Sequence, residues 1–318
     1  MAIIDTDIAQ AKAWLLAGNV VGVPTETVYG LAGNAFNEDA VLKIFQVKNR
    51  PHFDPLIVHT NSLEKLTAFV ASFPAVAQQL AEVFWPGPLT LLLPKSPLIS
   101  DLITAGLDTV AVRIPQHPVM LELLAALDFP LAAPSANPFG YISPTSAAHV
   151  AAQLGSQIPY ILDGGACKIG IESTIVGFEG AEVVVYRLGG ISVEALESVV
   201  GKVRVQTHSS SNPNAPGMLQ SHYAPRKKLL LGCPEKPADN WGYLAFSQPN
   251  AHIFPQYQRI LSPTRQYTEA AKHLFGYLRQ LDALPIAGIY AELFPNEDLG
   301  RAINDRLRRA AADDLFVE

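Results

Sequence analysis

The stretch from residue 20 to residue 59 constrains the fold most, because strand-like and polar segments alternate in it at short intervals. Residues 20–23 (VVGV) form an apolar run that predicts a short buried strand ended by Pro24. Polar side chains follow immediately, at Thr25, Glu26, Thr27 and Tyr29. Ligands of open α/β sheets usually bind where strands end in this way. The stretch therefore predicts an α/β fold with a ligand cleft at this strand end; the alternative is an ordinary solvated loop.

A basic turn and a second strand complete the stretch. Residues 38–47 have a helical pattern and lead to Lys48-Asn49-Arg50-Pro51, which places two cations on one turn. Arg50 offers a planar fork suited to phosphate or carboxylate, and Lys48 offers a mobile point charge, so both can converge on one anion. The alternative is a solvated surface pair. The strand predicted at residues 55–59 (PLIVH) ends in His59, so two strand ends and the turn can close on a single cleft.

Length and composition indicate a globular chain with a sizeable core. The 318 residues suggest about two domains, and 49% apolar with 16% charged residues excludes disorder. A net charge of −6 argues against a protein whose affinity comes mainly from nucleic-acid phosphates. Cys167 and Cys233 form no CxxC pair, so free thiols are a simpler interpretation than one disulfide. The sequence shows neither a signal peptide nor an apolar membrane span, which predicts a cytoplasmic protein.

Strand and helix patterns alternate up to residue 200. A helix is predicted over residues 5–18, with Asp5 or Thr6 as N-cap, and another over residues 144–154, with Ser143 as N-cap. Further helices are predicted at residues 62–73, 74–85, 117–127 and 192–200, and further strands at 89–93, 109–114, 131–133, 160–162, 173–178 and 182–187. We assign residues 1–200 to one α/β domain.

The character of the sequence changes at residue 201. Residues 201–225 are rich in Ser, Asn and Pro and have little apolar periodicity, which predicts an interdomain linker. Residues 226–318 resume a shorter alternation of strands and helices, including helices near 265–283 and 299–311. This pattern is typical of a small Rossmann-like α/β domain with a largely parallel sheet.

Cationic side chains also stand at other predicted strand ends. Thr109 and Arg113 are four residues apart in one strand and therefore share a face. Arg113 precedes Pro115 at the strand end, and Arg187 ends a later strand. Each of these cations could bind an anion at the edge of the sheet or be an ordinary surface residue.

Hydroxyl and amide groups follow the strand at residues 131–133. Ser135 and Asn137 come directly after it, and Ser143 is predicted at a helix N-terminus. Together they could form a cradle for a phosphate or nucleotide. The alternative is that they are ordinary turn and cap residues.

Several nucleotide, metal and nucleophile motifs are absent from the sequence. It contains neither GxxxxGK[ST] nor GxGxxG, and neither an HxxxH pair nor a Cys/His cluster that suggests a metal held by protein. It also contains no nucleophile elbow. Cations and hydroxyls without a nucleophile suit an enzyme that aligns anionic substrates and neutralises their charge.

Together these residues resemble the YrdC/TsaC-type L-threonylcarbamoyladenylate synthases, in their long form with a C-terminal extension. The shared motifs are PTETVYGL (24–31), KNRP followed by PL (48–56), SAN with a later SPTSA (135–147), DGG…ST (163–174), RLGG (187–190) and PGMLQSHYAP (216–225). Asp54 departs from the family pattern KxRPxxNPL, which has Asn there. The resemblance spans the whole chain and implies a YrdC-like twisted, open, mixed sheet with helices, followed by a smaller Rossmann-like α/β domain.

The resemblance also implies a reaction. The enzyme would be a nucleotidyltransferase that makes threonylcarbamoyl-AMP and pyrophosphate from ATP, bicarbonate and L-threonine, for the N6-threonylcarbamoyladenosine modification of tRNA. The threonine amine would form a carbamate that attacks the α-phosphate, so the reacting groups need cations more than a protein nucleophile.

Site residues carry over position by position. The threonine ligands would be Thr27, His59, Arg113, the Ala133 backbone and Ser173. The ATP ligands would be Lys48, Arg50, Asp54, Thr109, Ser135, Asn137, Ser143, Arg187 and Tyr223, and Lys48 and Arg50 would also act in catalysis. Tyr223 would close over the nucleotide, which makes the linker a lid. Mg²⁺ would be bound mainly by the phosphates of ATP, with no protein metal site.

The resemblance also implies partners for the enzyme, and two alternative functions stay open. Downstream threonylcarbamoyl-transferase proteins that act on tRNA would use the product, and a weak contact with tRNA is left open. An RNA-binding module is one alternative, although the chain lacks an aromatic-basic RNA motif. A carbamoyl-adenylate-handling domain of the hydrogenase-maturation kind is another, although the zinc-finger and acylphosphatase segments of those proteins are missing.

Overall fold

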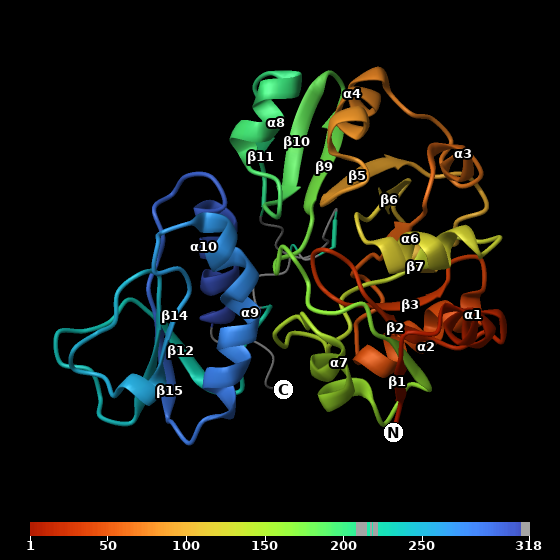
Figure 1. Cartoon of the computed structure of the whole chain (residues 1–318). Helices are drawn as coiled ribbons and strands as arrows, with labels where there is room; N and C mark the ends of the chain where they lie inside the picture. The colour runs from red at the N-terminus through yellow and green to blue at the C-terminus, as the bar shows by residue number, and fades with distance from the viewer. Residues whose placement is uncertain (208–214, 217, 219–221, 313–318) are drawn as a thin grey trace.

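One large mixed sheet dominates the N-terminal part of the protein. The computed structural model describes residues 1–207, 215, 216, 218 and 222–312. Within them, eleven strands lie in the order β1-β8-β2-β3-β7-β4-β6-β5-β9-β10-β11 (Figure 1). The strands are β1 (Ile3–Asp5), β2 (Val21–Val23), β3 (Gly30–Asn34), β4 (Ile57–His59), β5 (Leu89–Pro94), β6 (Thr109–Arg113), β7 (Leu131–Ala132), β8 (Tyr160–Leu162), β9 (Thr174–Glu179), β10 (Glu182–Arg187) and β11 (Arg204–Val205). The predicted mixed α/β sheet is confirmed.

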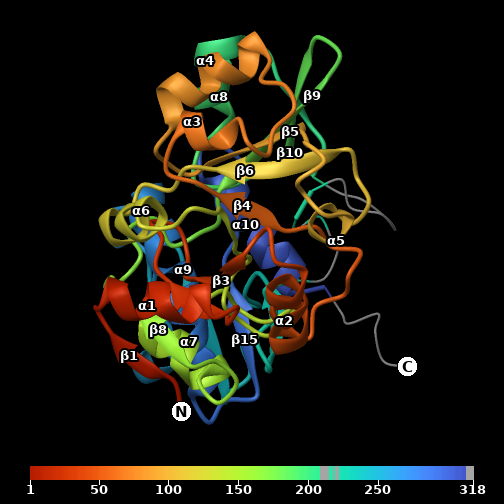
Figure 2. The same ribbon diagram turned by 90° about the vertical axis from the view of Figure 1, so that its right-hand side faces the viewer.

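Helices cover both faces of this sheet (Figure 2). They are α1 (Ile8–Leu16), α2 (Glu38–Lys48), α3 (Leu63–Leu66), α4 (Ala75–Phe84), α5 (Asp101–Thr104), α6 (Pro118–Ala125), α7 (Ala147–Leu154) and α8 (Val193–Val200). Successive strand residues point to opposite faces, so Leu31 of β3 packs in the core with Ile44 of α2, while Ala32 packs with Leu15 of α1 and Leu123 of α6. The sheet is therefore buried on both sides.

The C-terminal part has its own sheet. Four strands, β12 (Lys228–Leu231), β13 (Trp241–Ala245), β14 (Gln258–Ile260) and β15 (Gly288–Ala291), are all parallel and lie in the order β12-β15-β13-β14. The long helix α9 (Tyr267–Ala283) and the helix α10 (Gly300–Ala310) stand between this sheet and the N-terminal part (Figure 1). The predicted parallel α/β unit is confirmed.

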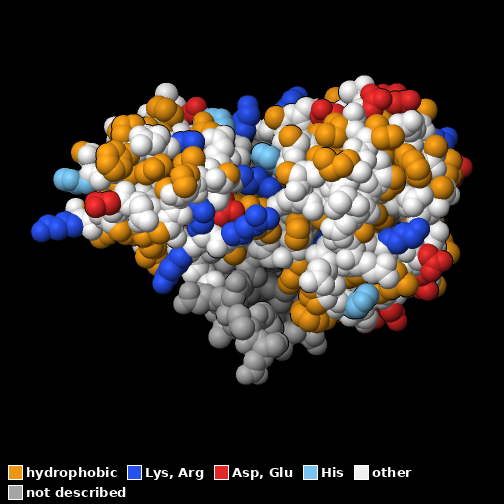
Figure 3. All heavy atoms as spheres, turned by 90° about the horizontal axis from the view of Figure 1, so that it is seen from below, with side chains coloured by type: hydrophobic (Ala, Val, Ile, Leu, Met, Phe, Trp, Pro, Cys, Tyr) orange, Lys and Arg blue, Asp and Glu red, His pale blue; other side chains and the backbone are white. Residues whose placement is uncertain are grey.

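The two parts share a hydrophobic core. Val28, Ile142 and Ile171 of the N-terminal part pack with Leu274 and Phe275 of α9 in one buried cluster. Lys and Arg side chains gather near the junction on the face shown in Figure 3. The C-terminal part thus closes one side of the N-terminal part.

The predicted N-terminal helix over residues 5–18 is wrong at its start. Residues 3–5 form β1, which pairs in parallel with β8, and α1 begins at Ile8. Asp7 is the N-cap, because its carboxylate accepts hydrogen bonds from the backbone N–H groups of Ala9 and Gln10. Neither Asp5 nor Thr6 caps the helix.

The helix predicted over residues 144–154 also begins later than expected. α7 starts at Ala147, and its N-cap is Ser146, whose hydroxyl accepts a hydrogen bond from the His149 N–H. Ser143 is therefore not a cap, and its hydroxyl donates to Glu172 at 2.5 Å instead. The helix predicted at residues 62–73 is shorter in the structure, where α3 spans Leu63–Leu66. The sequence pattern also did not predict the strands β3, β11 and β14.

The linker and the termini are only partly described. Residues 208–214, 217 and 219–221 of the predicted linker, which include part of the PGMLQSHYAP motif, lie outside the described residues, as do residues 313–318. Among the helices of the described part, none is both long and apolar enough to cross a membrane.

Gly170 supports a testable prediction about the junction. Its φ is +82°, and a Cβ at this position would lie 2.5 Å from the Lys272 Cα of α9. Gly170→Ala should therefore lower the free energy of unfolding by about 3 kcal/mol, as judged by urea denaturation. Gly106→Ala is the matched control, because Gly106 has φ +80° and open space around its Cβ position; it should cost only about 1 kcal/mol. Equal losses would mean that the contact with α9 does not restrict this position.

Candidate active site

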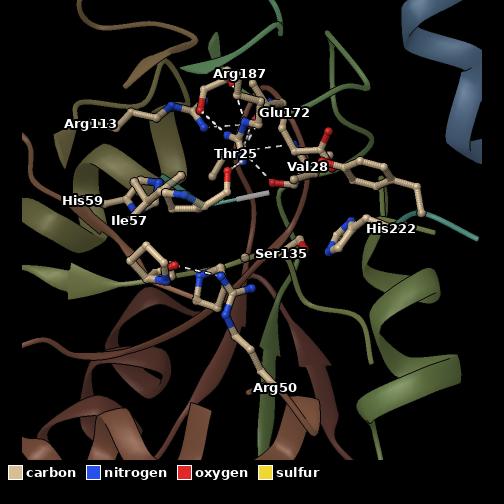
Figure 4. A pocket seen from close by; sticks show the side chains of 18 residues that line it. Thr25, Val28, Arg50, Ile57, His59, Arg113, Ser135, Glu172, Arg187 and His222 are labelled. Atoms are coloured by element: carbon tan, nitrogen blue, oxygen red, sulfur yellow. Dashed lines mark hydrogen bonds between the residues drawn. The ribbon is translucent and has the colours of Figure 1, made fainter. Parts of the chain in front are cut away.

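A small cavity lies beside the strand ends of β4, β6 and β10, where the linker meets the large sheet (Figure 4). Its volume is about 50 Å³. Such a volume holds about one or two water molecules, whereas pockets for cofactor-sized ligands enclose roughly 300–1,000 Å³. The cavity is therefore smaller than a typical pocket for a ligand of that size.

Arg113 is held in one orientation at the wall of the cavity. It ends β6, which runs parallel to β4, so that Arg113 lies opposite His59. Its Nη1 donates to the Thr27 hydroxyl at 2.9 Å, its Nε donates to the Gly87 carbonyl at 3.2 Å, and its Nη2 pairs with the Glu26 carboxylate at 2.7 Å. The guanidinium is 3% exposed. A buried fork fixed on three sides is suited to binding a carboxylate in a defined geometry.

Arg187 and Ser173 form a second polar group on the wall. Arg187 ends β10, and its Nη2 donates to the Ser173 hydroxyl at 2.9 Å while its Nε donates to the Ser173 carbonyl at 3.0 Å. The Ser173 hydroxyl also bonds to Thr90 at 2.7 Å. Burial lowers the pKa of Arg187 to about 10, with the charges of Arg306 and Arg113 adding to the effect. Arg187 therefore keeps its positive charge at neutral pH.

The basic turn supplies one cation to the cavity. Asn49 ends α2 in a left-handed conformation at φ 52°, which turns the chain so that Arg50 faces the cavity. Arg50 pairs with the Asp54 carboxylate at 2.9 Å and donates to the backbone carbonyls of Asp54 and Pro55. Burial lowers the pKa of Arg50, and Asp54 opposes that shift. Asp54 thus orients the cation and offsets part of its charge.

Lys48 does not reach the same cavity. Its ammonium donates to the backbone carbonyls of Ser135 and Asn137, each at 2.6 Å, and only 1% of the residue is exposed. Burial and the nearby charge of Arg50 lower the pKa of Lys48 well below its usual value. The prediction that Lys48 and Arg50 converge on one anion is wrong for this structure: Lys48 fixes the Ser135–Asn137 loop from behind.

The predicted phosphate cradle is only partly present. Ser135 lines the cavity, but Asn137 is buried behind it and donates to the Pro138 and Tyr141 carbonyls. Ser143 bonds to Glu172 and lies at no helix N-terminus. The cavity therefore has hydroxyl groups and cations but no helix N-terminus at Ser143.

The structure brings together most of the predicted site residues. Those that line the cavity are Thr27, Arg50, His59, Arg113, Ala133, Ser135, Ser173, Arg187 and Tyr223. Four further predicted residues lie behind the wall and bond to residues that line it: Lys48 and Asn137 to Ser135, Asp54 to Arg50, and Ser143 to Glu172. Thr109 lies at the opposite end of β6 from Arg113, beside a different cavity lined by Pro94 and Tyr186.

Sequence reasoning missed two ionisable residues of the wall. Glu172 and His222 both line the cavity. Each is the neighbour in sequence of a residue that was singled out, Ser173 and Tyr223, and that adjacency was the available signal. Of the described residues that line the cavity, Glu172 is the one carboxylate, and both of its oxygens are occupied, by Ser143 and by Arg306.

The two histidines of the wall are neutral. Burial, followed by the charge of Arg113, lowers the pKa of His59 to about 3. Burial and then the charges of Arg50 and Lys48 lower the pKa of His222 well below its ordinary value. At neutral pH the cations of the cavity are therefore the three arginines, and the imidazoles can bond to a ligand without adding charge.

No carboxylate cage for a metal is present in the part of the chain that the structure describes, since no group of three His, Cys, Asp or Glu side chains comes together there. The fold and the site together define an α/β protein with a buried, arginine-lined cavity whose charge is suited to anions.

Comparisons with known proteins identify the family. The Sua5_yciO_yrdC family model, described as "Telomere recombination", matches residues 13–189, and a model described as "Threonylcarbamoyl-AMP synthase, C-terminal domain" matches residues 191–312. The chain therefore belongs to the Sua5/YciO/YrdC family, in the form that carries this C-terminal domain.

Full-length relatives agree with this assignment. A threonylcarbamoyl-AMP synthase of Bacillus subtilis is 40% identical over 96% of this chain and 93% of its own length. One from Pyrococcus abyssi is 39% identical over 95% and 93%. The crystal structure of P. abyssi Sua5 complexed with L-threonine superposes with a TM-score of 0.89 and 37% identity over 98% of this chain and 97% of that one. These findings confirm the predicted family, its long form, and the enzyme class, a nucleotidyltransferase of the threonylcarbamoyl-AMP synthase type.

The neutral state of His59 predicts a pH dependence of stability. Because the folded pKa of about 3 lies below the ordinary 6.5, the unfolded chain binds the extra proton first, and stability falls as the pH drops below 6.5. His59→Gln should remove this contribution. As the pH falls below 6.5, the free energy of unfolding of the variant should decrease less steeply than that of the parent, and the two slopes should differ by about 1.4 kcal/mol per pH unit. Urea denaturation at several pH values below 6.5 measures both slopes. Identical slopes would contradict a neutral, buried His59.

Proposed function

We propose that this chain is a threonylcarbamoyl-AMP synthase, which makes threonylcarbamoyl-AMP and pyrophosphate from L-threonine, bicarbonate or CO₂, and ATP. The observation that carries the proposal is the single cavity that gathers the buried guanidinium groups of Arg50, Arg113 and Arg187. An amino-acid carboxylate and a triphosphate are both anions, so a site for the two needs several cations held close together away from water. The names of the full-length relatives support the same function.

Threonine would bind at the β4–β6 end of the cavity. Arg113, oriented by Glu26, would bind its carboxylate, and the hydroxyls of Thr27 and Ser173 would lie on either side. The neutral imidazole of His59 suits a hydroxyl, and the Ala133 backbone would accept from the amine. A cationic His59 would instead compete with the ammonium group, so its low pKa supports this assignment.

ATP would bind toward Arg50 and Arg187. Ser135 and Tyr223 line the same side, and Lys48, Asp54, Asn137 and Ser143 would act from the wall by holding these groups in place. Thr109 was assigned to ATP as well, but its place beside Pro94 and Tyr186 gives that assignment no support.

The reaction would proceed by alignment of anions. The deprotonated threonine amine attacks CO₂ derived from bicarbonate, a proton is lost, and a carbamate forms. A carbamate oxygen then attacks the α-phosphorus and pyrophosphate leaves. Negative charge accumulates at each step, and Arg50 and Arg187 would stabilise it; this role fits a site whose described lining residues offer no activated nucleophile.

Mg²⁺ would enter as part of the ATP substrate. The carboxylate of Glu172 is occupied by Arg306 and Ser143, so the described wall offers the ion few ligands of its own. Mg²⁺ commonly keeps several waters and binds through substrate phosphates, which is consistent with this arrangement.

The linker would act as a lid over the nucleotide. Tyr223 and His222 line the cavity, and the cavity of about 50 Å³ has no room for ATP until such a segment moves. The division into a catalytic domain at residues 1–200, a linker at 201–225 and a C-terminal domain at 226–318 is part of this proposal.

The product would pass to threonylcarbamoyl-transferase proteins that modify tRNA in the cytoplasm. The positive charge of the Lys and Arg side chains near the junction would permit a weak contact with tRNA (Figure 3). The reaction itself needs no RNA.

A direct assay tests the function. The purified protein should release pyrophosphate from ATP only when both threonine and bicarbonate are present, and mass spectrometry should find threonylcarbamoyl-AMP in the same mixture. RNA should change neither result. Binding of RNA without pyrophosphate release would favour the RNA-binding module, and product formed without threonine would favour another carbamoyl-adenylate.

Asp54 gives a second test, because this chain has an acid where the family pattern has Asn. Its buried carboxylate pairs with Arg50 at 2.9 Å and offsets the cation that would meet the phosphates. Asp54→Asn should lower the KM for ATP about three- to tenfold and leave the KM for threonine unchanged, since one opposing charge is removed. Initial rates of pyrophosphate release measure both constants. Asp39→Asn removes an exposed charge from α2, the helix that precedes the basic turn, and serves as the control. A higher KM for ATP in Asp54→Asn would show that the carboxylate is needed.

A further inference from the structure

One arginine of the C-terminal part reaches the back of the cavity wall. Arg306 lies in α10 and is fully buried. Its Nε donates to Glu172 at 3.0 Å, and its Nη1 donates to the Leu188 carbonyl and to Asp305. The guanidinium also lies over the ring of Tyr223, 5.3 Å from its centroid. Arg306 therefore contacts two residues that line the cavity without lining it itself.

Each of these two residues holds a further part of the site. Glu172 lines the cavity and accepts a hydrogen bond from the Ser143 hydroxyl at 2.5 Å, through the oxygen that Arg306 leaves free. Tyr223 has a left-handed backbone conformation at φ 68°, which is unfavourable for a residue with a side chain. Its ring contacts Arg306 and also stacks on Phe275 of α9, with the ring centroids 5.5 Å apart. The C-terminal helices thus hold Tyr223 in a conformation that the chain would not adopt alone.

We propose that Arg306 is a positioning residue for the nucleotide side of the active site, and that the C-terminal domain contributes to catalysis through it. The proposal rests on the proposed function, because it assigns Ser143 and Tyr223 to ATP. Arg306 acts in two ways: it holds the Glu172 carboxylate against Ser143, and it supports the ring of Tyr223. It touches no substrate itself.

Arginine is the residue that these contacts require. The planar guanidinium donates in its plane to Glu172 and Leu188 while its face stacks on Tyr223. Lysine would keep the charge near Glu172 but cannot make the in-plane and stacking contacts together. Loss of the cation would also leave the buried carboxylate of Glu172 without its ion partner, so Glu172 would turn away from Ser143.

A second ion pair of the same helix provides a matched control. Arg301 of α10 pairs with Glu194 of α8 at 2.8 Å, so it also joins the C-terminal part to the N-terminal part. Its side chain is 30% exposed, and its bonding partners Glu194 and Asn296 do not line the cavity. Arg301→Ala removes an ion pair across the junction without touching Glu172 or Tyr223.

The kinetic test uses full-length Arg306→Met, Arg306→Lys and Arg301→Ala. Arg306→Met should raise the KM for ATP at least tenfold and change the KM for threonine less than threefold; Arg306→Lys should fall between Arg306→Met and the parent. Arg301→Ala should leave both constants unchanged. A purely structural role would lower kcat through a smaller folded fraction and leave both KM values alone, and that result would overturn the proposal, as would equal increases in the two KM values.

A second measurement is independent of activity. Hydrogen–deuterium exchange of the ligand-free protein should be faster in Arg306→Met at residues 140–145 and 222–224, and unchanged there in Arg301→Ala. Unchanged exchange in both variants would overturn the positioning role. If the parent protein makes no threonylcarbamoyl-AMP, the proposed function fails, and the exchange result still decides whether Arg306 orders these two segments.

Discussion

Buried guanidinium groups need partners, and that need organises this protein around one cavity. Arg113 is held by Glu26 and Thr27, Arg50 by Asp54, and Arg306 by Glu172. Moving an ion out of water costs several kcal/mol, and removing one member of a buried pair typically costs about 3–5 kcal/mol. Segments far apart in sequence are therefore committed to one arrangement, since a displaced strand or helix would leave a charge uncompensated. The same partners fix where each cation points, so the ion pairs that stabilise the fold also set the geometry of the site.

The residues that sequence reasoning placed well are those whose position depends on local strand pattern. His59, Arg113 and Arg187 each stand at the end of an apolar run. Their strands β4, β6 and β10 run in the same direction, so these ends lie at one edge of the sheet. The pairing of His59 with Arg113 follows because β4 and β6 run parallel and end together. Local pattern was sufficient for these residues, and the family motifs then supplied their roles.

Other expectations failed where a distant partner outweighed a local signal. Ser143 before Pro144 looks like a helix start, but Glu172 takes its hydroxyl and the helix begins at Ala147. The predicted N-terminal helix starts at residue 5, but residues 3–5 pair with β8 in the sheet and the helix begins at Ile8. Thr109 does share a face with Arg113, yet four residues along a strand span roughly 13 Å, so it lies at the wrong end. Lys48 stands next to the site in sequence, and its direction depends on carbonyls of the 135–137 loop. Pairings between segments so far apart leave no periodic trace in the sequence.

The net charge of −6 gives a misleading picture of this cavity, whose described lining carries three arginines and one glutamate. Surface charges are screened over about 10 Å at ordinary ionic strength, so the groups within the cavity decide which ligand enters. Each arginine already has an internal partner, and an incoming anion gains only the difference between its own attraction and that of the partner. A small single anion gains little from such an exchange. A ligand that brings several charges at once gains at every arginine together. Under the proposed function, these internal carboxylates and carbonyls would favour a triphosphate bound together with an amino acid over single small anions from the surrounding solution.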